Sequence, residues 1–435
     1  MLKQSHSKHE PPPDLDLTFL RRLAYKTILE LETPLGINAS GKEDRYAAFF
    51  GRDSMITGLK LLKVYKKTPD KAYLRIIEKT LKTAARLQGQ SVNLSSGEKP
   101  GKIIHEYREE GYSHLSKRPY NWYVYPDHTL RNYDSVDATP LFLILAAEFY
   151  NTTQNGNLLQ SLLPTVKKAF NYLENFSPKR GNKLFLEYQL HRTGDHGGLV
   201  NQGWMDSVGS VLINRKLPRQ PMALVEVQGY YFKSLKLWSG IFESIDKGFS
   251  VKLGEKANRL KEEFNKLFIM KTHDLYYFAQ ALFAQEAIIL EVRSNPGHCL
   301  WAAVENNGYF ESIIEDKYIS DIIKRLMEPD LFTESGGIRT LSSESSFFDP
   351  FSYHNGSVWP FDNGLITEGF ENFGFGREAE RVRQAVLHGV NKFATPVELY
   401  CVGIDGRINE YLEKNGHFGA HKQAWTAATI LDFTT

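Results

Sequence analysis

Carboxylates and aromatic rings occur close together in several short stretches of this sequence. Residues 201–207 read Asn-Gln-Gly-Trp-Met-Asp-Ser, so Trp204 and Asp206 are two positions apart. A carboxylic acid near an indole ring is partly desolvated, which raises its pKa and allows it to donate a proton near neutral pH. Such an acid can protonate a glycosidic oxygen. Asp206 has a second interpretation as a helix N-cap, because Asp and Ser are favoured caps and a helix-like segment follows.

Residues 353–360 read Tyr-His-Asn-Gly-Ser-Val-Trp-Pro, which is too polar for a core segment and too apolar for an ordinary surface loop. The stretch contains Tyr353, His354, Asn355 and Trp359. Aromatic rings with adjacent hydrogen-bonding groups form the usual wall of a saccharide subsite. The alternative is a structural tyrosine corner.

Arg52 and Asp53 open an apolar segment in the stretch Phe-Gly-Arg-Asp-Ser at 50–54. One interpretation is structural: Asp53 or Ser54 caps the helix and Arg52 pairs with a neighbouring acid. In the other, both side chains bind sugar hydroxyls, because a carboxylate that accepts two hydroxyl hydrogen bonds discriminates well in a dry pocket.

His105, Glu106 and Arg108 form another compact polar group. Adjacent His and Glu residues do not have metal-ligand spacing, and no second His follows at such a spacing, so we expect no metal site. Two late glutamates, Glu398 and Glu410, are candidates to activate a water molecule. Most glutamates are solvated surface groups, and only the combination with a proton donor singles these two out.

The composition excludes several classes of function. The chain has 435 residues, of which 42% are hydrophobic and 24% charged, as in an ordinary globular protein. With 53 basic and 51 acidic residues, it predicts neither a nucleic-acid partner nor a membrane surface. Cys299 and Cys401 have no metal-type spacing. Without a signal-peptide core or an apolar run of about 18 residues, we expect a cytoplasmic protein.

Helical spacing of apolar residues dominates the pattern along the chain. Residues 1–14 read as a disordered leader, and we expect 15–435 to form one domain with long loops at 88–133 and 177–221. Strand signals are few, at 183–189 and 276–278. Twelve helices predict an all-α protein whose six hairpins close into an (α/α)6 toroid, with the polar-aromatic loops meeting at one end. The helices are expected at 15–31, 56–65, 71–87, 140–150, 158–176, 223–245, 251–268, 298–304, 313–327, 357–373, 378–393 and 423–433.

Eight short motifs occur in order between residues 49 and 425. They are Phe-Phe-Gly-Arg-Asp-Ser at 49–54, Val-Asp-Ala-Thr-Pro at 136–140, the stretch at 201–207, Glu-Val-Gln-Gly-Tyr at 226–230, Ser-Asn-Pro-Gly-His at 294–298, Gly-Ile-Arg-Thr-Leu at 337–341, the stretch at 353–360 and Gln-Ala-Trp at 423–425. Together they resemble the amylo-alpha-1,6-glucosidase family, the glucosidase half of glycogen-debranching enzymes and their bacterial relatives among the six-hairpin glycosidases.

The resemblance implies an (α/α)6 barrel and an inverting α-glucosidase mechanism with Asp206 as general acid. For the base it implies a late glutamate. Glu398 is our choice because Val-Glu-Leu-Tyr-Cys at 397–401 is similar to the family's Pro-Glu-Leu-Phe-Cys, and Val397 in place of proline keeps Glu410 as the alternative.

We expect an exo-acting enzyme without a cofactor, acting on a carbohydrate of low molecular weight. Many relatives carry an extra domain ahead of the barrel, and the early start of helix one favours a small α-glucan oligosaccharide or a glucosyl conjugate. The rival functions are a glycoside phosphorylase and a non-catalytic carbohydrate-binding protein. The expected substrate contacts are Arg52, Asp53, His105, Glu106, Asp137, Trp204, Gln228, His298, Tyr353, His354, Asn355, Trp359 and Trp425.

Overall fold

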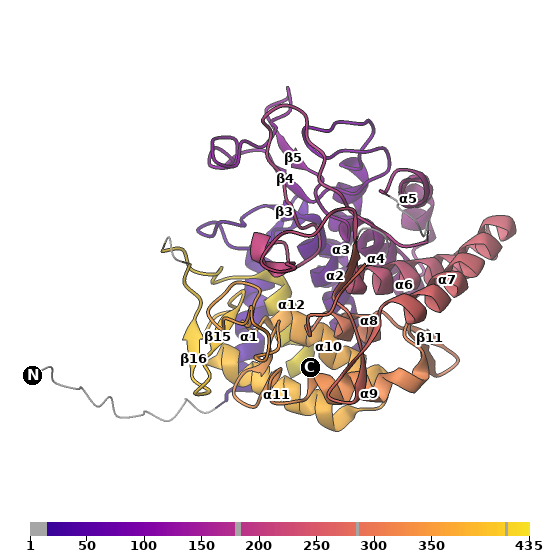
Figure 1. The fold of residues 1–435 in the computed structure, drawn as a ribbon. Coiled ribbons are helices and arrows are strands. Elements are labelled where there is room, and N and C mark those ends of the chain that lie inside the picture. The colour runs from indigo at the N-terminus through magenta and orange to yellow at the C-terminus, as the bar shows by residue number, and fades with distance from the viewer. Residues whose placement is uncertain (1–14, 179–183, 284–286, 414–415) are drawn as a thin grey trace, which may run out of the picture.

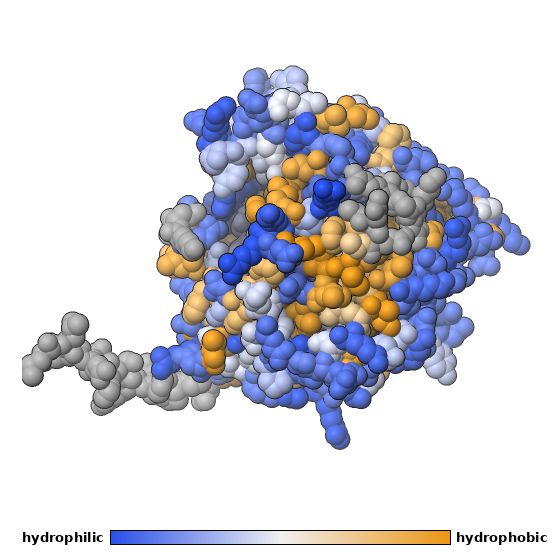
Figure 2. Space-filling model, in the orientation of Figure 1, coloured by the Kyte–Doolittle hydropathy of each residue, from blue (hydrophilic) through white to orange (hydrophobic). Residues whose placement is uncertain are grey.

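The computed structural model describes residues 15–178, 184–283, 287–413 and 416–435 (Figure 1). The predicted leader, 1–14, lies outside the described residues. None of the described helices is long and apolar enough to cross a membrane. Hydrophilic residues cover most of the face seen in Figure 2, with apolar residues gathered near its centre.

Twelve α-helices occur in the described part of the chain, one in each range that the hydrophobic spacing predicts. The all-helical prediction is therefore confirmed at the level of the helices. They are α1 (Leu17–Leu31), α2 (Gly51–Lys67), α3 (Lys71–Arg86), α4 (Ala138–Thr153), α5 (Gly156–Asn175), α6 (Val225–Phe242), α7 (Lys247–Leu267), α8 (Pro296–Trp301), α9 (Asp316–Leu326), α10 (Pro360–Asn372), α11 (Gly376–Asn391) and α12 (Ala424–Thr434).

The even-numbered helices form an inner set. Along the series α2, α4, α6, α8, α10 and α12 each helix contacts the next, and α12 contacts α2. Each odd-numbered helix packs against the outside of this set: α3 on α2, α5 on α4, α7 on α6, α9 on α8, α11 on α10, and α1 on α12. Figure 1 shows α8, α10 and α12 toward the centre of the molecule, with α5, α7, α9 and α11 nearer its edge.

The amino-acid sequence explains which helices lie inside. In α4 an unbroken run from Ala138 to Ala147 is buried, whereas α3 buries residues at three- and four-residue spacing and exposes lysines and arginines between them. A helix that is apolar on all sides is stable only when it is surrounded, and an amphipathic helix covers a core on one side. Helices buried on all sides alternate along the chain with amphipathic ones, and this alternation places every second helix inside.

Short strands are more numerous than the sequence signals predicted. Each has two to four residues, and all pair in sheets of two or three strands. They are β1 (Glu32–Thr33) with β2 (Gly36–Ile37); β3 (Phe49–Phe50), β4 (Glu106–Arg108) and β5 (Leu130–Asn132); β6 (Met222–Leu224), β9 (Ala281–Phe283) and β10 (Ala287–Ile289); β7 (Ile269–Thr272) with β8 (Leu275–Phe278); β11 (Val304–Asn306) with β12 (Tyr309–Glu311); β13 (Phe332–Thr333) with β14 (Gly337–Ile338); and β15 (Tyr400–Val402) with β16 (Ile408–Glu410).

One strand prediction is confirmed and the other is wrong. The prediction at 276–278 corresponds to β8, whereas the described part of 183–189 contains only an isolated bridge between Tyr188 and Met222. The backbone of Leu186 bonds instead to the Gln228 side chain, which accepts from its N–H at 2.9 Å and donates to its carbonyl at 2.9 Å. A buried amide side chain thus replaces a strand partner.

Lys60 of α2 joins the two ends of the inner series. Its buried ammonium donates to the Gly364 carbonyl of α10 at 2.8 Å, to Glu368 of α10 at 2.7 Å and to Asp432 of α12 at 3.0 Å. Because the side chain is 1% exposed, few waters can replace these partners.

Lys60→Met is expected to lower the free energy of unfolding by about 2 kcal/mol, because it removes the buried cation beside Asp432 and leaves that buried carboxylate with only the more exposed Lys63 and Lys67. Guanidinium chloride unfolding monitored by tryptophan fluorescence measures the change. The control is Lys66→Met on the same helix, whose side chain is 54% exposed and lies 3.8 Å from Glu148, and it should cost about 0–1 kcal/mol. Equal losses in the two variants would contradict this role of Lys60.

Candidate active site

A pocket lies where inner helices begin. Much of its wall comes from the first turns of α2 and α12 and from Trp359, which directly precedes α10. Loops between helices supply the rest. The lining consists of Tyr46, Phe50, Arg52, Asp53, His105, Trp204, Asp206, Tyr353, His354, Trp359, Glu398, Gln423 and Trp425.

The remaining inner helices also begin beneath this pocket. Asp137, which precedes α4, bonds to Arg52, and His298 of α8 stacks on Trp204 with ring centroids 5.8 Å apart. Glu226 in the first turn of α6 lies against Gly203. Helix N-termini carry partial positive charge, which favours a carboxylate in the first turn, such as Asp53 of α2.

Asp206 is the most open carboxylate of the pocket, with 27% of its side chain exposed. Arg52 Nη1 lies 3.2 Å from its Oδ2. Burial raises the pKa of Asp206 above its usual range, and the charge of Arg52 acts against that rise. The following 3-10 helix, Val208–Ser210, has Ser207 at its N-cap position, so the N-cap interpretation of Asp206 is wrong.

Arg52 connects two helices to the loop that carries Asp206. Its Nε donates to Asp137 Oδ2 at 2.6 Å, and its Nη2 donates to the Gly203 carbonyl at 2.7 Å. Asp137 is fully buried and also accepts a bond from Ser135 at 2.6 Å. Asp137 therefore holds Arg52 and does not reach the pocket, although the sequence placed it among the substrate contacts.

Glu398 lies deeper than Asp206 and is 2% exposed. Its two oxygens have separate partners: Tyr353 Oη donates to Oε1 at 2.6 Å, and the Ala420 N–H donates to Oε2 at 2.9 Å. Burial raises its pKa to about 7, the two hydrogen bonds oppose that rise, and the charge of Asp206 adds to it. The carboxylate form is thus populated near neutral pH.

Glu410 lies elsewhere. It ends β16 with 40% of its side chain exposed, pairs with His421 Nε2 at 2.7 Å, and is not part of the pocket wall. Of the two late glutamates, the structure brings only Glu398 together with Asp206.

Asp53 occupies the first turn of α2, whose N-cap residue is Phe50, so Asp53 is not the helix cap. Gln423 Nε2 donates to its Oδ1 at 3.3 Å. Burial raises the pKa of Asp53 to about 8, which leaves its carboxyl largely protonated at neutral pH. A protonated carboxyl both donates and accepts, as a sugar hydroxyl requires.

Aromatic rings support each other around the pocket. His354 stacks on Trp359 with centroids 5.1 Å apart, and Trp359 also contacts Tyr353 and Trp425 edge to face. Trp204 meets His354 and Trp359 edge to face at 5.6 and 5.8 Å. The packed rings fix each other's positions and present a rigid wall.

Several buried polar atoms of this wall have no hydrogen-bond partner among the described residues. Burial holds the pKa values of His105 and His354 well below their usual range, so both imidazoles are neutral. Buried polar groups in folded proteins are normally satisfied, and five unsatisfied ones around a single pocket fit a ligand rich in hydroxyl groups. The atoms are His105 Nδ1, Trp204 Nε1, His354 Nε2, Gln423 Oε1 and Trp425 Nε1.

Four further residues expected at the substrate support the wall from behind. Glu106 pairs with Arg108, and Gln228 bonds to Leu186 as described above. His298 is fully buried between Tyr230 Oη at 2.6 Å and Asp362 Oδ1 at 2.7 Å. Asn355 accepts from Arg293 at 2.8 Å and donates to the Gly209 carbonyl at 3.0 Å. The structure does not bring these four to the pocket.

Arg293, which the sequence analysis did not single out, joins two loops of the site. It is 1% exposed, and its Nη1 donates to the His354 carbonyl at 2.8 Å and contacts Met205 Sδ at 3.6 Å. Within the described chain it has no carboxylate at ion-pair distance. Burial accordingly lowers its pKa to about 10. Its position directly before the Ser-Asn-Pro-Gly-His motif was the only sequence signal. Tyr46 and Gln423 also line the pocket without having been predicted there.

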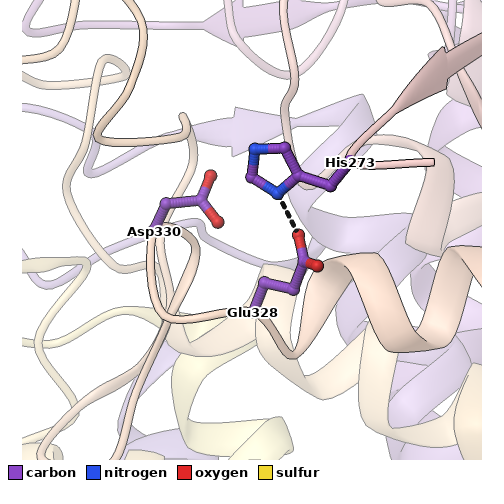
Figure 3. Close-up of side chains that lie close together, drawn as sticks. All are labelled: His273, Glu328 and Asp330. Atoms are coloured by element: carbon purple, nitrogen blue, oxygen red, sulfur yellow. Dashed lines mark hydrogen bonds and ion pairs between the residues drawn. The ribbon is translucent and has the colours of Figure 1, made fainter. Parts of the chain in front are cut away.

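One cluster outside the pocket has residue types that can hold a metal: His273, Glu328 and Asp330 (Figure 3). His273 Nδ1 lies 2.7 Å from Glu328 Oε2, and both Asp330 oxygens accept from the Arg325 guanidinium at 2.8 and 2.7 Å. A guanidinium between the carboxylates repels a metal cation. These residues form an ion-pair network.

Comparison with known proteins identifies the class and then the family. A mannosylglycerate hydrolase of family GH63 from Thermus thermophilus, in complex with Tris, shares the fold with a TM-score of 0.63 and 14% identity, over 96% of this chain and 100% of that chain. A wild-type glycosidase aligns with a TM-score of 0.58 and 11% identity, over 96% of each chain. No curated protein sequence matches the chain. The fold is thus that of glycosidases.

Residues 124–432 match the amylo-alpha-1,6-glucosidase family, and this span is well over half of the chain. The protein belongs to that family and is a glycoside hydrolase by family. The resemblance carried by the eight motifs is confirmed.

Tyr353→Phe is expected to raise the pKa of Glu398, because the variant removes a hydrogen bond that stabilises the carboxylate. A carbon-13 NMR titration of Glu-labelled protein measures the change, with Glu398→Gln to assign the resonance. The control is Tyr411→Phe, because Tyr411 packs against Tyr353 at a centroid distance of 5.3 Å without a bond to Glu398. An unchanged titration in Tyr353→Phe would contradict this assignment.

Proposed function

We propose that the protein is an inverting, exo-acting α-glucosidase that hydrolyses a small α-glucan oligosaccharide or a glucosyl conjugate. The main support for this proposal is the pair Asp206 and Glu398, two carboxyl groups with raised pKa values in one aromatic pocket. The closed series of contacts between the even-numbered helices supports an (α/α)6 toroid. Packing of each odd-numbered helix, from α1 to α11, on that series supports a single domain over 15–435.

Asp206 takes the role of general acid. Burial raises its pKa and so favours the protonated carboxyl, and its partial exposure allows contact with a leaving group. Arg52 bonds to Oδ2 and so orients the carboxyl. The same guanidinium stabilises the carboxylate that remains after proton transfer.

Glu398 takes the role of general base. Tyr353 and the Ala420 N–H fix its orientation, and its pKa of about 7 suits proton abstraction from water. Glu398 and Tyr353 also line an adjoining cavity of about 330 Å³, which gives water access to the base. An inverting mechanism requires room for that water, so the two carboxyl groups are expected about 6.5–9.5 Å apart.

The sugar is held by the unsatisfied polar atoms of the wall and by Asp53. Asp53, His105 and His354 bind hydroxyl groups. The sugar ring contacts Trp204, Trp359 or Trp425. These two kinds of contact account for the mixture of polar and aromatic residues in the pocket. A pocket enclosed by helix starts and loops receives the end of a chain, which supports exo action.

The charge around Glu398 favours hydrolysis over phosphorolysis. A phosphorylase needs cationic groups where the base would otherwise lie. Within the described lining of the pocket, Arg52 is the one side chain that is cationic at neutral pH, and Asp137 and Asp206 already bind it. Arg45 lines the adjoining cavity, where Glu43, Asp44 and Glu413 offset its charge and Glu413 lies 3.8 Å from its guanidinium. A binding protein, in turn, has no use for two carboxyl groups whose pKa values are both raised by burial in one pocket.

Asp206→Asn is expected to reduce kcat on an unactivated α-glucoside by about 10²- to 10⁴-fold with little change in Tm, because the amide cannot deliver a proton. Activity on α-glucosyl fluoride, whose leaving group needs little protonation, should fall much less. Hexose release from isomaltose, panose and limit dextrin and fluoride release measure the two rates. Near-normal turnover of isomaltose by the variant would remove Asp206 from this role.

Glu398→Ala with added azide is expected to convert an α-glucosyl donor to the β-glucosyl azide, because the anion fills the space of the missing base and attacks the anomeric carbon. Glu410→Ala serves as the matched control and should retain wild-type kinetics. Proton NMR of the product and of freshly released glucose reports the configuration. Initial release of α-glucose by the wild-type enzyme would refute inversion, and azide rescue of Glu410→Ala alone would move the base to Glu410.

A further inference from the structure

A second, smaller cavity lies behind the loop that carries Asp206. Lys99, Lys102, Asp134, Tyr172, Arg192 and Gln202 are among the residues that line it. It leaves about 20 Å³ for the centre of a water-sized sphere. About 10–15 Å³ is enough for one water molecule, so the cavity has room for a water molecule or a small ion.

The Lys102 ammonium in this cavity lacks a bonded counterion in the described part of the chain. The residue is 5% exposed. Its backbone N–H donates to the Lys99 carbonyl at 3.0 Å, but among the described residues its ammonium donates no hydrogen bond and forms no ion pair. The ammonium lies over the Tyr172 ring, whose centroid is 5.8 Å from Nζ. A buried charge is costly unless it is paired, so this ammonium calls for a partner that the protein does not supply.

The other charged groups do not supply that partner. Asp134 is 1% exposed and is held by Arg192 and by the Leu199 N–H at 2.9 Å. Lys99 donates to the Phe176 carbonyl at 2.9 Å and adds a further positive charge. Glu187 and His191 also line the cavity. Three cationic side chains thus face two carboxylates, one of which Arg192 already neutralises.

We propose that this cavity binds one chloride ion, with the Lys102 ammonium as its principal ligand. A monoatomic anion fits the volume, balances the excess positive charge and needs no directional donors beyond the ammonium. Burial lowers the pKa of Lys102 to about 7, and a bound anion restores the charged form. The inference does not depend on which glycoside the enzyme hydrolyses.

The ion would support the start of the loop that carries Asp206. Gln202 lines the cavity, and its carbonyl accepts from the Val136 N–H at 2.9 Å and from Arg52 Nη2 at 3.4 Å. Asp134 holds the backbone at Leu199, three residues earlier. A chloride ion bound in the cavity would therefore stabilise the segment from Leu199 to Gln202, which leads to Trp204 and Asp206.

Halide-dependent stability of the full-length protein tests the site. In potassium gluconate at constant ionic strength, replacement of gluconate by chloride or bromide should raise Tm along a saturating curve, by on the order of 2 °C. Sulfate should give no such curve. Lys102→Met should lose the halide response and should be at least as stable as the wild type without halide, because it removes an unpaired buried charge. Lys82→Met, at an exposed position, should keep the wild-type response.

Crystals grown with sodium bromide provide the direct readout. An anomalous bromine peak next to Lys102 Nζ in the wild type, absent from Lys102→Met, is the expected result. A water molecule there without anomalous signal, or a halide response that persists in both Lys102→Met and Lys102→Gln, would overturn the proposal.

Discussion

The buried arginine at the start of α2 is the contact on which the site depends. Arg52 bonds to Asp137 at the start of α4, to the carbonyl of Gly203, and to Asp206. One guanidinium therefore joins two inner helices to the loop that carries the candidate acid. Because the side chain is 3% exposed, water cannot replace a lost partner, and loss of any of its hydrogen bonds would destabilise the fold. The planar, five-donor geometry of arginine suits this junction in a way that lysine does not.

Burial acts on the two carboxyl groups through different surroundings. Asp206 is partly open and pairs with a cation, whereas Glu398 is almost fully enclosed by neutral donors from Tyr353 and Ala420. In both cases desolvation raises the pKa. The exposed group can meet a leaving group and the enclosed one can hold a water, and this difference in surroundings supports the proposed acid role of Asp206 and base role of Glu398.

Many motif residues form a second layer behind the pocket. Asp137, Gln228, His298 and Asn355 each bond to backbone or to another buried side chain. These residues are polar because loops cover the N-termini of the inner helices. Backbone N–H and C=O groups buried there need hydrogen-bond partners other than water. Arg293 belongs to the same layer, and it links the two loops that supply Met205 and His354. A rigid second layer is what holds a first layer in place.

The amino-acid sequence by itself determined the helices and the chemical character of the site. Three- and four-residue spacing located all twelve described helices, because each must bury an apolar face wherever it packs. The Trp204 and Asp206 stretch and the 353–360 stretch indicated a pocket for a sugar, since such residue types serve neither a core nor an ordinary loop. The start of α2 was placed five residues late, because Gly51 to Ser54 are polar or small yet helical.

Only the tertiary structure decided which polar residues face the pocket. The family-like segment at 397–401 favoured Glu398 over Glu410 without excluding the latter. In the structure, pairing of β15 with β16 leaves Glu410 at the surface with His421, while Glu398 accepts a bond from Tyr353 in the pocket. Sequence spacing likewise could not separate Asp53, which lines the pocket, from Asp137, which lies behind it. Local sequence sets what a residue can do, but its partners come from segments distant in the chain, and those partners fix its exposure and its pKa.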